Sequence, residues 1–120
     1  LVIHSKNLNH DFCYKNGQLL RYAKEFSPHG ININFFNISK NNIIEITTYE
    51  KGIENIVQSC ASGSTAVVFH LFKKLYIKSP VITKSPGGLL RFEFDRQWKN
   101  VWTEGPAELI YIGTNYNIKK

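Results

Sequence analysis

The residues best suited to chemistry lie in one short segment, in which Cys60 directly precedes the small residues Ala61-Ser62-Gly63-Ser64. Serine is a capping residue and glycine allows close backbone approach, so this segment predicts the start of a helix. The unpaired N–H groups of a first helical turn form an anion-binding arrangement. A thiolate at Cys60 would be favoured by the positive helix end. A cysteine that only packs in the interior is an equally good interpretation of the spacing.

The helix that should follow is expected to be buried on all sides. Between Ala66 and Leu75 the apolar residues point in every direction around a 3.6-residue period rather than along one stripe. The run is shorter than the roughly 20 apolar residues that a membrane span needs, so we expect protein to cover it. Its polar exceptions, His70, Lys73 and Lys74, lie near the carboxyl end, where cations suit the helix dipole.

The rest of the chain reads mainly as strands with short turns. Apolar residues at i, i+3, i+4 and i+7 predict one further helix over Gln18–Phe26. Alternation places Asn32 and Asn34 on one face of a strand, either to bind a polar ligand or as a solvated surface. The expected strands are Leu1–His4, Ile31–Phe35, Ile43–Tyr49, Val81–Lys84, Leu89–Asp95, Val101–Thr103 and Glu108–Ile112. We therefore predict an α+β fold, a mostly antiparallel sheet or barrel wrapped around the central buried helix.

Composition limits the function classes. A chain of 120 residues fits one domain, predicted over residues 1–112 with a tail over 113–120. The net charge of +6 comes mostly from scattered lysines, so we expect neither nucleic-acid nor membrane binding. Two cysteines make no disulfide framework, and with no signal peptide we expect a cytoplasmic location. His10 and Cys13 lack a second ligand pair, so no metal site is predicted. An apolar first strand without methionine suggests a chain that begins inside a longer protein.

Five motifs, taken in order, resemble the C-terminal half of diaminopimelate epimerase. They follow the family patterns G-x-N-V-N-F, Y-E-R-G, C-G-[TS]-G, P-G-G and G-P-A. Here they read Gly30-Ile31-Asn32-Ile33-Asn34-Phe35, Tyr49-Glu50-Lys51-Gly52, Cys60-Ala61-Ser62-Gly63, Pro86-Gly87-Gly88 and Gly105-Pro106-Ala107. Their order and spacing cover most of the chain from the first helix to Ile112.

The resemblance implies a cofactor-independent isomerase, using neither pyridoxal phosphate nor metal, that interconverts LL- and meso-diaminopimelate for lysine and peptidoglycan precursor synthesis. Two lobes, each a sheet rolled around a helix, would enclose the amino acid, and each would supply one proton-transferring cysteine. Cys60 would be the cysteine of this lobe. Substrate contacts would come from the side chains of Asn32, Glu50 and Lys51 and from the first-turn N–H groups of Ala61 and Ser62. A separate N-terminal lobe is the expected partner.

The sequence departs from the family at three places. Lys51 replaces an arginine that would bind a carboxylate with two hydrogen bonds. Ala61 replaces a glycine, and Ile56-Val57 replaces a polar Glu-Thr pair. The cysteine of the other lobe is absent, and Cys13 lies outside every matching motif. An inactive remnant, or a module binding a small anion or amino acid, is therefore the alternative hypothesis. A homodimer with two Cys60 thiols facing one cavity is a third.

Overall fold

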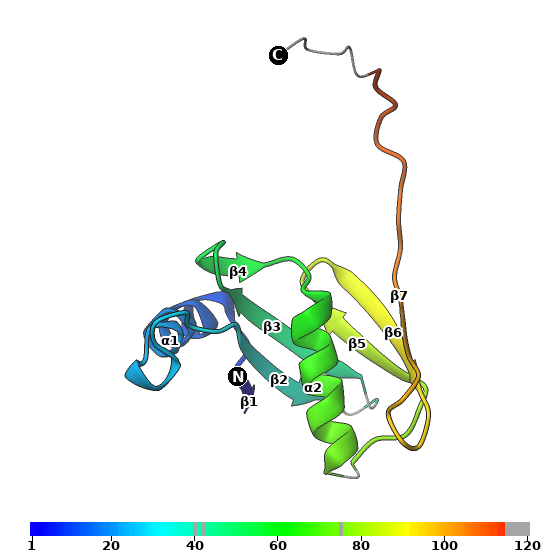
Figure 1. Ribbon diagram of the computed structural model, residues 1–120, viewed down its shortest axis with the longest axis horizontal. Coiled ribbons are helices and arrows are strands. Elements are labelled where there is room, and N and C mark those ends of the chain that lie inside the picture. The colour runs from blue at the N-terminus through cyan, green and yellow to red at the C-terminus, as the bar shows by residue number, and fades with distance from the viewer. Residues whose placement is uncertain (40, 42, 75, 115–120) are drawn as a thin grey trace.

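One mixed sheet and two helices make up the body of the protein. The computed structural model describes residues 1–39, 41, 43–74 and 76–114. In chain order its elements are β1 (Val2–His4), α1 (His10–Arg21), a short 3-10 helix η1 (Lys24–Phe26), β2 (Ile33–Ile38), β3 (Ile44–Glu50), β4 (Asn55–Val57), α2 (Ala61–Lys73), β5 (Val81–Ser85), β6 (Gly88–Phe94) and β7 (Val101–Glu104). Figure 1 shows α2 lying across the sheet and α1 beside it.

The sheet is open, with strand order β1-β2-β3-β5-β6-β7 and β4 added to β3. Neighbouring strands run antiparallel except for the parallel pairs β1–β2 and β3–β5. The predicted α+β class and mostly antiparallel sheet are therefore confirmed, whereas closure into a barrel is wrong. Strands β4 and β5 share β3: β4 pairs with it around Thr48–Glu50 and β5 around Ile44–Glu45. Strand β4 therefore ends beside β3, in the middle of the sheet, and α2 begins four residues later.

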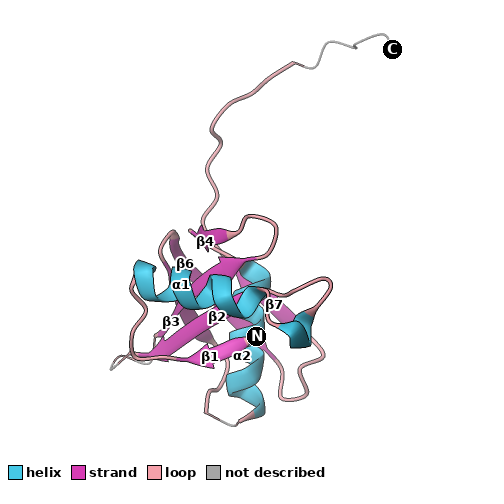
Figure 2. Ribbon diagram, turned by 90° about the vertical axis from the view of Figure 1, so that its left-hand side faces the viewer, coloured by secondary structure: helices cyan, strands magenta, loops and turns pink. Residues whose placement is uncertain are grey.

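The two helices cover opposite faces of the sheet. Successive side chains of β2 and β3 point to alternate faces, so each strand contributes apolar residues to both helices. On one face Phe36, Ile44 and Ile46 form an apolar core with Val67, Val68 and Leu71 of α2, and Phe92 joins them. On the other face Ile33, Phe35 and Tyr49 pack with Cys13 of α1. Figure 2 shows the sheet from its edge side, with the two helices separated by strands.

Helix α2 is buried on one side only, so the expectation of burial all round is wrong. Val67, Val68 and Leu71 face the sheet and are buried. On the opposite side Ala66 and Lys73 are exposed, and Phe69 is 39% exposed. The reason is that the sheet does not close, so the described part of the chain covers one face of this apolar helix.

Helix α1 lies earlier in the chain than the predicted Gln18–Phe26 segment. It begins at His10, capped by the Asn9 side chain, which accepts a 2.8 Å hydrogen bond from the Phe12 N–H. Its buried positions are Cys13, Gly17 and Arg21. Leu19 and Tyr22, which defined the predicted stripe, are 73% and 65% exposed. The apolar spacing failed because the buried positions of the helix are a cysteine, a glycine and an arginine, while Phe12 and Leu20 pack beside them only partly buried.

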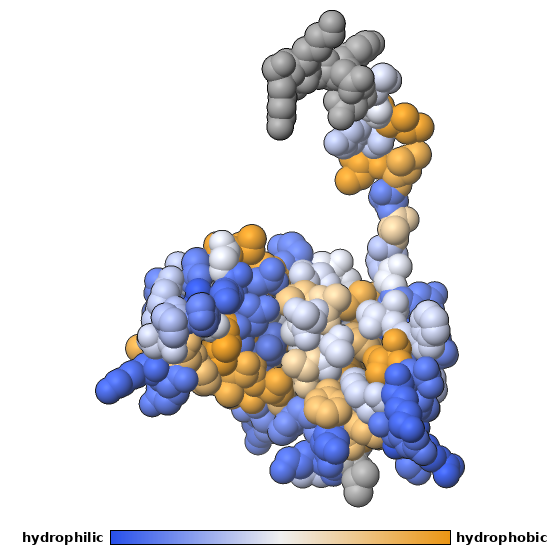
Figure 3. All heavy atoms as spheres, in the orientation of Figure 1, coloured by the Kyte–Doolittle hydropathy of each residue, from blue (hydrophilic) through white to orange (hydrophobic). Residues whose placement is uncertain are grey.

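The remaining strand predictions divide into confirmed hairpins and one missing strand. The strands predicted around Ile31–Tyr49 and Val81–Asp95 pair as the β2–β3 and β5–β6 hairpins, whereas β4 lies in a segment where no strand was predicted. The expected strand at Glu108–Ile112 is wrong: residues 105–114 form no strand and leave the body as an arm (Figure 1). From Leu109 to Ile112 the arm's side chains are 79–89% exposed, and Figure 3 shows apolar groups standing clear of the body. From residue 115 on, the predicted tail lies outside the described residues.

Candidate functional site

Cys60 is the residue that caps α2. Its sulfur accepts a 3.4 Å hydrogen bond from the Gly63 N–H and lies 3.4 Å from the Ser62 hydroxyl. The residue is 8% exposed. The helix start predicted at this segment is confirmed, but the cap is the cysteine itself rather than a serine. Ser64, another expected cap, is buried inside the helix, where its hydroxyl has no hydrogen-bond partner in the described part of the chain.

Gly63 allows the first turn of α2 to sit directly on the sheet. A Cβ at this position would overlap the Asn34 Oδ1 and would lie 3.1 Å from the Thr48 Oγ1. Asn34 is 2% exposed, and its Oδ1 accepts a 2.9 Å hydrogen bond from the Thr48 hydroxyl. Asn34 is therefore neither a solvated residue nor a free ligand group, because the helix start covers it.

Asn32 links the cysteine to the turn after β3. Its Nδ2 lies 3.7 Å from the Cys60 sulfur, and its Oδ1 accepts a 2.9 Å hydrogen bond from the Lys51 N–H. The structure thus brings together Asn32, the Lys51 backbone and Cys60, three of the positions predicted to form one site. The Lys51 side chain is exposed to solvent.

The other predicted contacts lie on the rim of this arrangement. Ala61 and Ser62 are exposed at the first turn of α2, where N–H groups have no acceptor within the helix. Glu50 ends β3 and is half-buried, and its carbonyl oxygen accepts a 2.8 Å hydrogen bond from the Glu54 N–H. No contact of the Glu50 carboxylate with the cysteine is present among the described residues.

The substituted pair Ile56-Val57 belongs to β4 rather than to the site itself. Ile56 is half-buried and packs on the α1 side of the sheet, against the core that contains Tyr49. The apolar side chain of Ile56 therefore has a packing role. The strand leads into Gln58 and Ser59, so its pairing with β3 sets where Cys60 begins the helix.

Cys13 and His10 do not join Cys60. Cys13 is fully buried in α1, and burial raises the pKa of its thiol to about 11. His10 lies on the helix surface and stacks on Tyr14, with 6.0 Å between ring centroids. Within residues 1–39, 41, 43–74 and 76–114, no three His, Cys, Asp or Glu side chains are grouped to hold a metal ion.

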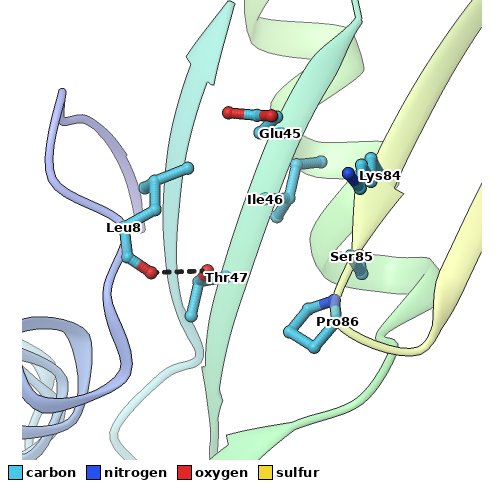
Figure 4. Close-up of a pocket in the computed structure, with 7 residues that line it drawn as sticks. All are labelled: Leu8, Glu45, Ile46, Thr47, Lys84, Ser85 and Pro86. Carbon is cyan, nitrogen blue, oxygen red and sulfur yellow. Dashed lines mark hydrogen bonds between the residues drawn. The ribbon is translucent and has the colours of Figure 1, made fainter.

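A separate hollow lies on the α1 face of the sheet. It measures about 210 Å³ and opens between the Leu8 loop, β3 and the end of β5 (Figure 4). Glu45 and Lys84 line it, and the Thr47 hydroxyl on its floor donates a 3.4 Å hydrogen bond to the Leu8 carbonyl. Cys60 lies on the other side of the sheet, so this hollow is not part of the cysteine site.

The arrangement around Cys60 suits proton transfer to or from an anionic substrate. N–H donors at a helix start stabilise both a thiolate and a bound carboxylate. A hydroxyl and an amide also touch the sulfur, so the thiolate would receive up to three hydrogen bonds, from Gly63, Ser62 and Asn32.

In the described part of the chain neither α-helix has the length and apolarity to span a bilayer.

Sequence comparison finds diaminopimelate epimerases among the relatives of this chain. Diaminopimelate epimerase of Aquifex aeolicus is 33% identical over 102 residues, which are 82% of this chain and 36% of that protein. The enzyme of the same name from Chlorobaculum tepidum is 29% identical over 116 residues, 94% of this chain and 45% of the relative. The chain therefore spans less than half the length of these relatives. No established family profile matches it.

Solved structures show the same fold at low sequence identity. A phenazine biosynthesis protein of the PhzF family from Enterococcus faecalis superposes with a TM-score of 0.60 at 14% identity. The match covers 78% of this chain and 33% of that structure. The likeness supports the observed sheet and helix arrangement, and at this identity it carries no information on activity.

Proposed function

Because the chain belongs to the diaminopimelate epimerase family, we propose that it supplies one of the two proton-transfer centres of a cofactor-independent amino-acid epimerase. The observation that carries the proposal is the position of Cys60 as the cap of α2, with Gly63, Ser62 and Asn32 around its sulfur. The relatives' names support diaminopimelate as the substrate. The second centre would come from a lobe outside this chain.

In the proposed reaction the Cys60 thiolate takes the α-proton of the amino acid and becomes a thiol. The electron pair of the Cα–H bond stays on the α-carbon, next to the substrate carboxylate. The first-turn N–H groups of Ala61 and Ser62 would stabilise that carboxylate as negative charge grows. A second acid on the opposite face returns a proton to the carbon, which inverts the centre. In the reverse direction Cys60 is the acid.

The proposed substrate contacts beyond the first turn are Asn32, Glu50 and Lys51. Asn32 already binds the Lys51 N–H through its oxygen, so it would offer substrate at most the remaining donor capacity of its Nδ2. Lys51 extends into solvent and can reach a carboxylate as a single point charge. These contacts would hold the far end of the substrate less tightly than an arginine would.

Deuterium exchange tests the proposal. The chain is incubated with diaminopimelate in deuterated water, alone and with the part of the Aquifex aeolicus relative that it does not match. We expect α-deuterium incorporation and epimerisation only in the mixture, abolished by Cys60→Ser and retained in Cys13→Ser. Absence of exchange in folded protein under both conditions would contradict the proposal. Exchange by the chain alone, together with a dimeric mass, would support two Cys60 thiols sharing one cavity.

A binding module without activity is the second candidate. It is favoured by the exposed Lys51 side chain and by the apolar packing of Ile56 at a position where the family has a polar residue. In that case diaminopimelate raises the melting temperature of the parent chain and of Cys60→Ser alike. Exchange is absent from both proteins, including after addition of the relative's missing part.

A further inference from the structure

Arg21, the last residue of α1, is buried although it is charged. It is 8% exposed and forms an ion pair with Glu54, with 3.0 Å between Nη2 and Oε1. Its Nε also donates a hydrogen bond of 3.1 Å to the same oxygen. Burying a guanidinium is costly unless its partners are well placed, so this pair holds two parts of the fold in a fixed geometry.

Glu54 lies in the turn that follows β3 and has an unusual backbone. Its φ is +56°, a left-handed backbone conformation that residues other than glycine rarely adopt. Its Oε1 accepts a 3.0 Å hydrogen bond from the Gly52 N–H as well as those from Arg21. The Gly52 N–H, together with Tyr22 and Arg21, holds the pKa of Glu54 below its ordinary value. The carboxylate is therefore ionised at neutral pH and fixes the shape of the turn.

Arg21 also holds the second segment that leads to Asn32. Its Nη1 donates a 3.3 Å hydrogen bond to the carbonyl oxygen of His29. The next residue is Gly30, with φ +59°, and a Cβ there would overlap the guanidinium. Arg21 thus contacts both the turn that carries Lys51 and the bend that precedes Asn32.

These two segments meet at the Asn32 side chain. The Lys51 N–H donates to its Oδ1, so the oxygen must face the turn and the Nδ2 must face the other way, toward the Cys60 sulfur. A rotated amide would present an acceptor to the sulfur and would disfavour the thiolate. The orientation of one amide therefore decides whether the sulfur receives a donor or an acceptor.

We propose that Arg21 and Glu54 are positioning residues, which hold the 50–54 turn and the 29–32 segment so that the Asn32 amide donates to the Cys60 sulfur. The proposal deepens the proposed function and rests on it only for the consequence in catalysis. Thiol reactivity measures the positioning directly, because the alkylation rate follows the thiolate fraction.

The key variant is Glu54→Gly, which removes the carboxylate and suits the left-handed backbone. A second variant, Arg21→Lys, alters the other partner of the pair. Its matched control is Arg91→Lys, which makes the same substitution in a surface ion pair of β6. Iodoacetamide modification of Cys60 near neutral pH, followed by mass spectrometry, should slow by about three- to tenfold in Glu54→Gly, the effect of losing one hydrogen bond of ordinary strength. Arg21→Lys should slow it in the same direction, and Arg91→Lys should leave it unchanged.

Two further measurements separate positioning from loss of structure. Cys13 is fully buried, so general loosening would speed its modification and that of Cys60, whereas the proposal requires slower Cys60 and unchanged Cys13 modification. In an Asn32→Leu background Glu54→Gly should have no additional effect. Modification of Cys60 at the parent rate or faster in Glu54→Gly would overturn the proposal. If the alkylation pattern holds but deuterium exchange is absent, the proposed function fails and the positioning role stands.

Discussion

The Gly87 N–H donates a 2.7 Å hydrogen bond to the carbonyl oxygen of Gln58. This contact joins the turn between β5 and β6 to the loop that ends at Cys60. Gly87, which follows Cys60 by 27 residues, thereby supports the start of the helix that carries the thiol. The Pro86-Gly87-Gly88 motif, one of the five that carry the resemblance, therefore has a structural role at the cysteine site.

Replacing Gly87 with alanine tests this support. The added Cβ would lie 2.9 Å from the Gln58 carbonyl oxygen and 3.0 Å from its Cβ, so the loop before Cys60 must move. We expect the free energy of unfolding, measured with urea, to fall by about 1–3 kcal/mol. Gly113→Ala is the control, because its Cβ would meet no heavy atom closer than 3.5 Å. Equal stability of the two variants would contradict the proposed support.

Gly63→Ala should push the first turn of α2 away from the sheet. Alanine favours a helix over glycine by about 1 kcal/mol, but here its Cβ overlaps the buried Asn34 Oδ1. We expect a net loss of about 1–3 kcal/mol in urea unfolding. In an Asn34→Ala background the overlapping atom is gone, so Gly63→Ala should cost less there. Equal cost in the two backgrounds would show that the contact does not limit the approach of the helix.

The sequence predicts the features that depend on local pattern. Alternation identifies both hairpins, and the small residues after Cys60 identify the start of α2. How far α2 is buried could not be predicted in the same way. Apolar residues on every side of a helix indicate that it needs cover, but they do not show that the described part of the chain provides that cover. The buried positions of α1 do not follow from the apolar spacing, because Cys13, Gly17 and Arg21 form no apolar stripe.

The candidate site is predictable in its residues and unpredictable in its connections. Asn32, Lys51 and Cys60 come from separate motifs, and the structure joins them through one amide. Arg21 and Glu54 carry no sequence signal, since they are 33 residues apart and each has an ordinary surface residue type. Ion pairs between distant segments depend on the folded path of the chain and on no local periodicity.

The buried thiol of Cys13 should make the free energy of unfolding fall as pH rises in the alkaline range. Burial raises the pKa of its thiol from 9.0 to about 11, so the unfolded state releases this proton at lower pH than the folded state. The contribution is fully present below the unfolded value and is lost as pH rises from about 9 towards 11. Urea midpoints should therefore fall across this range, and fall less steeply in Cys13→Ala. Parallel pH profiles for the two proteins would contradict the assignment.

The arm should tolerate substitutions that the body does not. Ile110 is 89% exposed in the arm, whereas Ile46 is 2% exposed in the core between β3 and α2. Ile110→Ala should leave the free energy of unfolding within about 0.5 kcal/mol of the parent value, because it removes no buried contact. Ile46→Ala should lose about 2–5 kcal/mol through lost burial and a cavity. A loss in Ile110→Ala approaching that of Ile46→Ala, in urea unfolding of dilute protein, would mean that the arm packs on the body.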